Sequence, residues 1–454
     1  SALVIGAGGA LSCKAERGSF EFTVVLEHPE TVTAGETFEV TAFWIAADGT
    51  PVPPADDALE RLESSDPQLQ GPEALVFRSP SAGEEARAEF ELRTAGRQSI
   101  RFQSSDGTVF TVALNVEPAA PAVLVATATP DPVAAGESVQ LDLLLSDRFG
   151  NPVPDYRGPL QVSVQDPAAI LPVAEAVVVF DESARAAIPA AVEFRTAGVW
   201  EIVVEAGRSG SPPDPNLPGN GGPGTQIEGR SQPITVFPAA PARIEVLGVP
   251  RGSVVAGEPF DLSFRLFDRF GNPVSQSGGS FEVQTADAQA IVPTGVAYEP
   301  SGVGAPGEAG PAAALGTVEL RTASPRRQLL VVDAGNPSLG ASIGPLVVEP
   351  GPVARIEVDQ LPTSIRTGVE SDVRLRLFDA FDNRATTFRG SVQFRSTDPL
   401  ATLPAAASFG SAVDATVRLT DAVMFATRGR QTLAAALQTD PSVEGAASLD
   451  VTPG

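Results

Sequence analysis

A sequence unit that recurs four times limits the fold of this chain more than any other feature. Each copy opens with a small residue and a glycine, continues with an alternating apolar and polar run, and ends in a turn. The opening glycines are Gly35, Gly136, Gly257 and Gly368, which lie 101, 121 and 111 residues apart. A repeat of this period predicts tandem copies of one structural unit.

The run after each opening glycine alternates with the period of a β-strand, so its apolar residues share one face. The apolar series are Phe38, Val40, Ala42 and Trp44; Val139, Leu141, Leu143 and Leu145; Phe260, Leu262, Phe264 and Leu266; and Val373, Leu375 and Leu377. One dry and one wet face is typical of an antiparallel sheet packed on a second sheet. Trp44 is therefore predicted to lie in the core and not on a sugar-binding surface.

A second block, the strand–turn–strand runs from Phe90, Val192, Val318 and Met424, recurs in every copy, and a third recurs between the two blocks in the last three copies. One copy is about as long as an immunoglobulin-type domain. We therefore predict an all-β chain of four tandem immunoglobulin-like β-sandwich domains in an extended rod, joined by linkers that each contain two prolines. The predicted domains are residues 18–118, 119–240 (with a loop insertion at 207–233), 241–350 and 351–454, after an apolar N-terminal extension at 1–17.

The opening strand ends in Asp-Arg-Phe-Gly-Asn-Pro-Val in the second and third copies. Glycine and asparagine tolerate positive φ, and proline ends ladder pairing, so the motif predicts a structural turn. The predicted turn residues are Gly49, Pro51, Phe149, Gly150, Asn151, Pro152, Phe270, Gly271, Asn272, Pro273, Phe381 and Asn383.

The aspartates at these turns, Asp147, Asp268 and Asp379, are also candidate calcium ligands. Calcium takes six to eight oxygen ligands, and no DxDxD-type cluster accompanies these aspartates. The structural turn is the favoured interpretation.

Composition excludes several kinds of site. One cysteine and one histidine, His28, exclude an internal disulfide, cysteine-rich zinc sites and multi-histidine metal sites. We predict no catalytic residue and no cofactor.

The net charge of −25 disfavours nucleic acids and anionic membranes as partners. We expect no transmembrane span, since the longest apolar run, near the N-terminus, has about half of the roughly 20 residues required.

The unit resembles the bacterial immunoglobulin-like repeats (Big domains) of the invasin and intimin group, in which an AG-strand-D-x-F-G-N-P-V segment precedes an F-x-T-x-G strand pair. The fourth copy departs from this pattern at Asp382-Asn383-Arg384, and the first has Ala46 and Ala47 in place of the Asp-Arg pair. The resemblance implies a bacterial extracellular or cell-surface protein, of the kind that builds adhesin stalks, surface layers and fibres.

The N-terminal extension has several interpretations. Its apolar residues include Leu3, Val4, Ile5 and Leu11, followed by Cys13. It could be a signal remnant with Cys13 as a lipid anchor. Alternatively, it is an arm whose apolar strand completes a sheet in a neighbouring copy. We favour the arm.

The leading functional hypothesis is a non-catalytic structural or adhesive protein, a subunit of a surface filament, fibre or surface layer that self-associates into a homopolymer. The alternative is a carbohydrate-binding or lipid-anchored adhesin stalk, whose partner is a surface glycan or another cell-surface protein. Trp200, expected to be half exposed, keeps the glycan hypothesis open. An enzyme using paired carboxylates is the least favoured class, because 56 acidic residues make chance pairs inevitable.

Overall fold

The chain is built from strands and turns. A computed structural model describes residues 3–4, 11–17, 20–79, 81, 83–156, 159–171, 175–206, 227–300, 310, 312–410 and 414–454, and these residues form no helix. The prediction of an all-β fold is confirmed. The chain divides into two compact units, residues 1–237 and 238–454.

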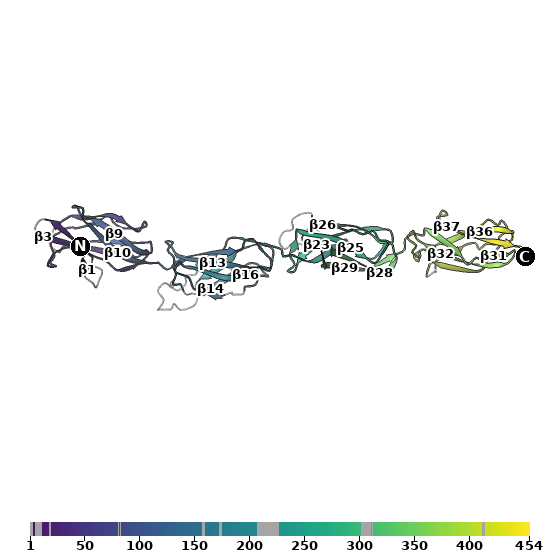
Figure 1. Cartoon of the computed structure of the whole chain (residues 1–454), viewed down its shortest axis with the longest axis horizontal. Helices are drawn as coiled ribbons and strands as arrows, with labels where there is room; N and C mark the ends of the chain where they lie inside the picture. The colour runs from purple at the N-terminus through teal and green to yellow at the C-terminus, as the bar shows by residue number, and fades with distance from the viewer. Residues whose placement is uncertain are drawn as a thin grey trace. The chain divides into compact units, whose positions relative to one another are not determined.

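The first unit holds two groups of sheets, which we call the first and second sandwiches (Figure 1). One sheet of the first sandwich contains, in spatial order, β1 (Leu3–Val4), β2 (Leu11–Arg17), β3 (Phe20–Glu27), β5 (Thr37–Ala46) and β8 (Glu85–Glu91). The other contains β4 (Thr31–Thr33), β10 (Val109–Glu117), β9 (Gly96–Gln103), β6 (Ala58–Ser64) and β7 (Ala74–Val76).

Three sheets make up the second sandwich. They are β11 (Pro121–Thr129), β13 (Ser138–Asp147) and β16 (Arg185–Glu193); β12 (Val133–Ala134), β20 (Ile234–Phe237) and β17 (Gly198–Trp200); and β15 (Glu175–Val177), β14 (Pro159–Val164), β18 (Ile202–Ala206) and β19 (Ile227–Arg230).

The second unit holds the third sandwich, with two sheets. The first joins β21 (Pro241–Leu247), β23 (Pro259–Asp268), β24 (Pro273–Val274) and β27 (Ala313–Glu319). The second joins β22 (Ser253–Val255), β29 (Asn336–Glu349), β28 (Ser324–Asp333), β25 (Ser277–Thr285) and β26 (Val296–Tyr298).

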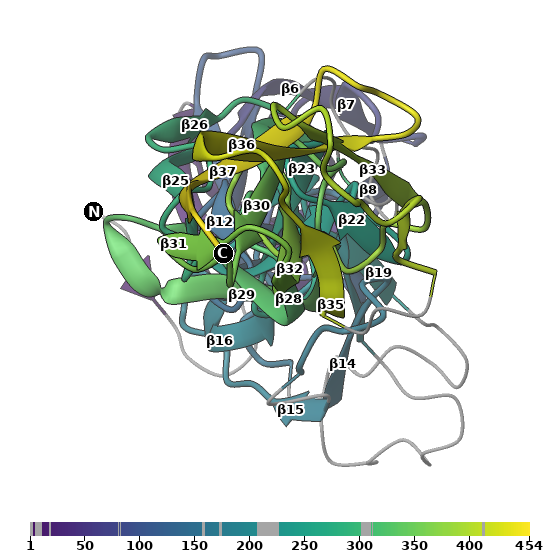
Figure 2. The ribbon, with the colours of Figure 1, turned by 90° about the vertical axis from the view of Figure 1, so that its right-hand side faces the viewer.

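The fourth sandwich follows in the same unit. One sheet contains β30 (Arg355–Asp359), β32 (Glu370–Phe378) and β35 (Thr416–Met424). The other contains β31 (Ser364–Arg366), β37 (Glu444–Thr452), β36 (Gly429–Leu437), β33 (Ser391–Ser396) and β34 (Ala407–Ser408). Figure 2 shows β36 and β37 in one layer and β32 and β35 in the other. The number of separately folding domains stays a prediction.

Alternation along the opening strands produces the cores, as predicted. Trp44 is 4% exposed, and Leu262, Phe264 and Leu266 are almost fully buried. Core clusters in the first, third and fourth sandwiches draw residues from both of their sheets. The apolar faces of two sheets therefore enclose each of these cores, which is the packing that the strand period predicts.

The start of each sandwich divides between two of its sheets. A first segment pairs antiparallel with the opening strand, as β3 does with β5 and β11 does with β13. A second, short segment pairs in parallel with the last strand of the other sheet: β4 with β10, β12 with β20, β22 with β29 and β31 with β37. This shared topology matches the repeat found in the sequence.

The N-terminal segment differs from expectation. We expected residues 1–17 to lie outside the first domain, but β2 pairs antiparallel with β3 from Leu11↔Leu26 to Arg17↔Phe20. Leu3 and Val4 pair with the start of β2, and Ile5 lies outside the described residues. The segment therefore has a place in the sheet of its own sandwich, where one edge of β2 is paired with β3.

Part of the predicted insertion at 207–233 is a strand. Residues 207–226 lie outside the described part, but Ile227–Arg230 form β19, which pairs with β18. In the third sandwich, residues 301–309 and 311 also lie outside the described part.

Candidate functional site: the joints between sandwiches

In both described junctions, an asparagine side chain ties one sandwich to the backbone of the one before it. Asn151 Nδ2 donates to the Arg93 carbonyl at 2.7 Å, and Asn151 Oδ1 accepts from the Ala95 amide at 2.8 Å. Asn383 repeats both contacts with Arg321 and Ala323, at 2.6 and 2.8 Å. An amide side chain can donate and accept at once, so asparagine suits this double contact.

The turn that carries Asn151 is organised by Asp147. Its Oδ1 accepts from the amides of Phe149 and Asn151 at 2.8 and 2.9 Å. Its Oδ2 accepts from Asn151 Nδ2 at 2.8 Å and from the linker amide of Ala119 at 2.9 Å. One buried carboxylate therefore fixes the turn, orients the asparagine and holds the linker.

The same four contacts recur in the third and fourth sandwiches. Asp268 accepts from Phe270, Asn272 and Ala239, and Asp379 accepts from Phe381, Asn383 and Gly351. The fourth turn forms although Asp382 replaces the glycine, at φ +65°. Aspartate is among the few residues that adopt this conformation readily.

These contacts bear on the calcium hypothesis. Each aspartate receives N–H donors at both oxygens, which orients hydrogen atoms and not lone pairs toward the carboxylate. Among the described residues, no group of three or more His, Cys, Asp or Glu side chains could hold a metal ion. The geometry favours the structural turn.

The first sandwich has the same turn backbone, but Ala46 stands at the position of Asp147, so the turn has no aspartate to accept these hydrogen bonds. Ala46 N donates to Thr50 O, as Asp147 N does to Asn151 O. Asp48 accepts from the amide and hydroxyl of Thr50, and these contacts lower the pKa of its carboxyl. Gly49, at φ +85°, and Pro51 lie in the turn.

Phe149 lies against the preceding sandwich, close to two guanidinium groups. Arg93 and Arg148 lie 5.5 and 4.6 Å from its ring centroid, within cation–π range. Arg93 also pairs with Glu91 at 2.6 Å. In the second unit, Arg321 lies 5.3 Å from the Phe381 ring and pairs with Glu319 at 2.7 Å.

The opening glycines Gly35 and Gly257 make room for these rings. A Cβ atom on Gly35 would lie 2.4 Å from the Phe149 ring, and one on Gly257 would lie 2.5 Å from the Phe381 ring. Both contacts are shorter than van der Waals separation allows. The glycine that marks the repeat therefore serves the neighbouring sandwich as well as its own turn.

The segments that receive Asn151 and Asn383 are corners, where the chain crosses from one sheet to another, and every sandwich has such a corner. We define the corners as Arg93–Ala95, Arg195–Ala197, Arg321–Ala323 and Ala426–Arg428; they lie between β8 and β9, β16 and β17, β27 and β28, and β35 and β36. The sequence predicted strand–turn–strand here but did not distinguish a hairpin from a corner.

A buried aspartate that sequence reasoning missed holds each corner. These residues are Asp66, Asp166, Asp287 and Asp398, all 5% exposed or less. Asp398, for example, accepts from the amides of Leu400, Ala426 and Thr427 at 2.7 to 2.9 Å. The signal was present as an Asp-Pro dipeptide in three copies and Asp-Ala in the third.

Hydrogen bonding controls the charge of these aspartates. Burial by itself raises the pKa, but bonds from the corner threonine and from backbone amides outweigh it. The pKa of all four carboxyls therefore lies below the usual value, and that of Asp398 falls to about 2. The four corners are held by ionised carboxylates at neutral pH.

In each corner, a side chain that follows the corner threonine by four or five residues donates a hydrogen bond to the threonine carbonyl; we call this contact the cap. The donors are Gln98, Trp200, Arg327 and Gln431, at 3.0, 2.8, 3.2 and 3.2 Å. Trp200 is half-buried, and its indole N–H is occupied by this contact. Its role here is structural, which weakens it as a sugar platform.

Comparisons with known proteins identify no family: no family model and no curated protein matches the sequence. Solved structures do match. The bacterial integrin-binding protein invasin is 14% identical, with a TM-score of 0.35, over 95% of this chain and 79% of its own. The Escherichia coli adhesin FdeC is 16% identical, with a TM-score of 0.37, over 74% of this chain and 99% of its own.

Surface layer protein SbsC, domains 4–9, is 14% identical, with a TM-score of 0.18, over 95% of this chain and 66% of its own.

The sandwiches are immunoglobulin-like. That assignment rests on the strand pairing and cores described above. Within the described residues, no helix is long and apolar enough to cross a membrane.

Proposed function

We propose that this chain is a non-catalytic extracellular protein with a structural or adhesive role, in which immunoglobulin-like sandwiches hold their neighbours at a fixed spacing. The observation that carries the proposal is the double hydrogen bond of Asn151 and Asn383 to the corner of the preceding sandwich.

Three contacts restrain each of these joints. The asparagine fixes the corner, the phenylalanine fills the space above the opening glycine, and the aspartate binds the linker amide. In each joint one corner amide and one linker amide donate to the turn of the following sandwich, which restricts the backbone on both sides of the junction. A spacer or stalk benefits from such restraint because it keeps distant surfaces apart.

Labels in the first and second sandwiches test this role. Inter-label distances from spin-label spectroscopy should form a narrow distribution in the native chain and broaden in Asn151→Ala. Asn115→Ala, at an exposed position on β10, is the control. A broad distribution in the native chain would refute the spacer.

The finer proposal is a filament, fibre or surface-layer subunit whose N-terminal arm contacts a neighbouring copy. Support comes from the edge of β2: β1 pairs only with Leu11 and Ser12, so among the described strands the outer edge from Cys13 to Arg17 has no partner. An open strand edge is a surface on which another strand adds. Cys13 lies within this strand, opposite Val24, and lipid anchoring is not part of the proposal.

Electron microscopy and light scattering of the full chain and of a 1–17 deletion test assembly. Filaments from the full chain alone would support the arm. Filaments from both would exclude the arm, and isolated particles from both would exclude the filament. Thermal unfolding of the deleted chain should confirm that its sandwiches remain folded.

A further inference from the structure

The first sandwich keeps a regular edge strand where the other three have a bulge. The ladders between β13 and β16, between β23 and β27, and between β32 and β35 each shift register once. Their edge strands also hold a residue at positive φ: Ala190, Gly316 and Asp421. The β5–β8 ladder stays in register throughout, and no described residue of β8 has a positive φ. Bulges blunt a sheet edge against further pairing, so β8 keeps the edge that its counterparts lose.

The open part of this edge runs from Glu85 to Glu89. Glu91 exchanges two backbone hydrogen bonds with Gln70, at 2.9 Å each, so both of its backbone groups point away from β5. Backbone groups point to alternate sides along a strand, so those of Glu85, Arg87 and Glu89 point the same way as those of Glu91. Among the described strands, β8 pairs with β5 alone, so this stretch of the edge has no partner strand.

The opposite edge of the same sheet, on β2, is open over a matching length. The alternation carries through the β5 and β3 ladders, so Cys13 and Ala15 direct their backbone groups at β3. Those of Lys14 and Glu16 therefore point outward. The short strand β1 covers this edge only as far as Ser12. Each edge thus offers a short open stretch with outward-directed backbone groups on alternate, charged residues.

We propose that β2 of one copy adds to β8 of a second copy as an antiparallel strand, with Lys14 opposite Glu89 and Glu16 opposite Arg87. The proposal rests on the arm contact suggested above and names the surface that receives the arm. Glu89 is exposed, and the Arg87 side chain is 58% exposed although it pairs with Glu85. Addition of a strand to an open edge is a common mode of recognition, because the backbone supplies the hydrogen bonds.

Charge selects this register. The outward-directed residues of both strands must lie opposite one another to share hydrogen bonds, so the register changes only in steps of two residues. In the proposed register both of these pairs join opposite charges. A slip one way would place Lys14 opposite Arg87 and Glu16 opposite Glu85, and a slip the other way would place Glu16 opposite Glu89. Opposite charges facing each other across two strands stabilise the pairing, and like charges destabilise it.

The pairing also sets the orientation of the two copies. Three antiparallel ladders separate β2 from β8, so the two strands run in opposite directions within one sheet. Antiparallel addition therefore places the first sandwiches of two copies side by side in the same orientation. Each copy offers one β2 edge and one β8 edge, so the contact is heterologous and repeats from copy to copy. Lateral growth of this kind fits a surface layer better than a fibre joined end to end.

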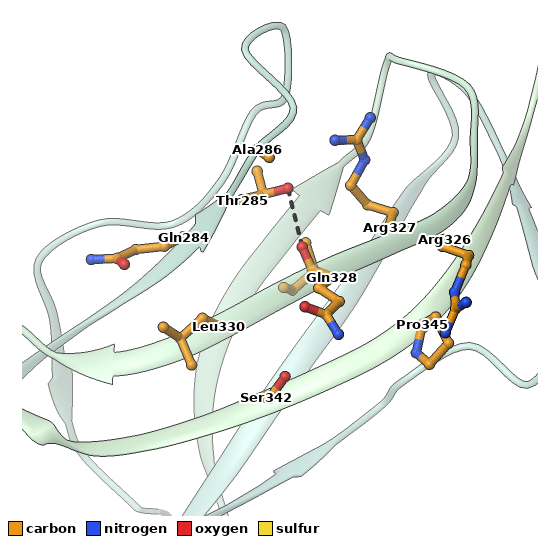
Figure 3. A pocket seen from close by; sticks show the side chains of 10 residues that line it. Gln284, Thr285, Ala286, Arg326, Arg327, Gln328, Leu330, Ser342 and Pro345 are labelled. Atoms are coloured by element: carbon orange, nitrogen blue, oxygen red, sulfur yellow. Dashed lines mark hydrogen bonds between the residues drawn. The ribbon is translucent and has the colours of Figure 1, made fainter.

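The pocket of the third sandwich offers no comparable match of charges. Its volume is about 810 Å³, and its lining comes mainly from β25, β28 and β29 (Figure 3). Arg326 points toward Pro345, whereas Arg327 points the other way and caps the Thr322 carbonyl (Figure 3). These two charges do not converge on one ligand, whereas the charges of β2 and β8 match one to one.

Charge reversal in the full chain tests the pairing. Sedimentation velocity at low ionic strength measures the association, since salt screens exposed charges. Glu89→Lys puts a like charge opposite Lys14 and should weaken association about tenfold, and adding Lys14→Glu should restore it. Glu60→Lys is the matched control, because Glu60 is exposed on β6 in the other sheet, and it should leave association unchanged.

Glu89→Pro tests the backbone contact itself. Proline removes an N–H that points away from β5, so the β5–β8 ladder keeps its hydrogen bonds and the added strand loses one of its donors. We expect no association of this variant. Its thermal unfolding should show that the first sandwich remains folded.

The outcomes separate this inference from the proposed arm. If the 1–17 deletion abolishes association but Glu89→Pro and Glu89→Lys associate as the native chain does, the arm stands and its docking on β8 is wrong. Failure of the double charge reversal to restore association would overturn the register. A native chain that stays monomeric would overturn both the arm and the docking.

Discussion

The corners of the third and fourth sandwiches are held by the same kind of buried aspartate, but only the third carries an ion pair. Asp287 and Asp398 hold the two corners through equivalent hydrogen bonds. Glu319 and Arg321 form an ion pair in the third, whereas Met424 and Ala426 stand at these positions in the fourth.

The residues around the two corners differ as well. A Cβ on Gly257 would collide with the Phe381 ring, but one on Gly368 would meet no atom within 4 Å. Val369 and Leu400, 47% and 69% exposed, replace Glu258 and Gln289. The comparison separates a corner frame common to all copies from a set of joint residues that the third corner has and the fourth lacks.

The largest expected effect is loss of the frame. Asp398→Ala would leave three backbone amides and the Thr427 hydroxyl without their acceptor, so we expect the fourth sandwich to lose about 3 kcal/mol of unfolding free energy. Urea unfolding measures it, with exposed Asp450→Ala as control. Asp287→Ala should cost the third sandwich a similar amount, and a large inequality would contradict a common frame.

Protonation of the corner aspartate at low pH should also lower the unfolding free energy. The folded pKa of Asp398 is lowered from 3.8 to about 2, so its contribution is present above about pH 4 and is lost as the pH falls through about 2. The loss should be about 2 kcal/mol. Urea midpoints at about pH 5 and pH 2 measure it, and Asp398→Asn should reduce the difference. Equal pH dependence in native chain and variant would contradict the assignment.

Loss of the joint should have a smaller effect. Asn383→Ala removes two hydrogen bonds to the third sandwich, for which we expect about 1–2 kcal/mol. The Ala323 amide loses its acceptor, so its hydrogen exchange should accelerate about tenfold. Exposed Asn336→Ala should leave that amide unchanged. Unaltered exchange in Asn383→Ala would show that the joint is not formed in solution.

The sequence could predict those features that depend on local pattern. Strand alternation predicted the buried series from Phe38 to Leu377, because burial on one face needs only a period of two. The turn residues were also predicted, since Gly150 and Pro152 have strong local preferences. None of this required knowledge of distant contacts.

The missed roles depend on contacts between distant positions. Asp66 bonds to Thr94, 28 residues away, and Asn151 bonds to Arg93, 58 residues away. No local propensity encodes such pairs. The Arg327 cap is harder still, because glutamine, tryptophan and arginine perform the same task in different copies. Their shared property is an N–H donor of suitable reach.

The smallest expected effect tests whether the ion pair has value without a neighbouring ring. Met424→Glu combined with Ala426→Arg would give the fourth corner the residues of the third. Surface ion pairs contribute about 0–1 kcal/mol, so we expect the fourth sandwich to change by less than about 0.5 kcal/mol. Arg321→Ala, which loses both the pair and the contact with Phe381, should cost about 1 kcal/mol. If the double substitution stabilised the fourth sandwich by as much as Arg321→Ala destabilises the third, the pair would belong to the common frame and not to the joint.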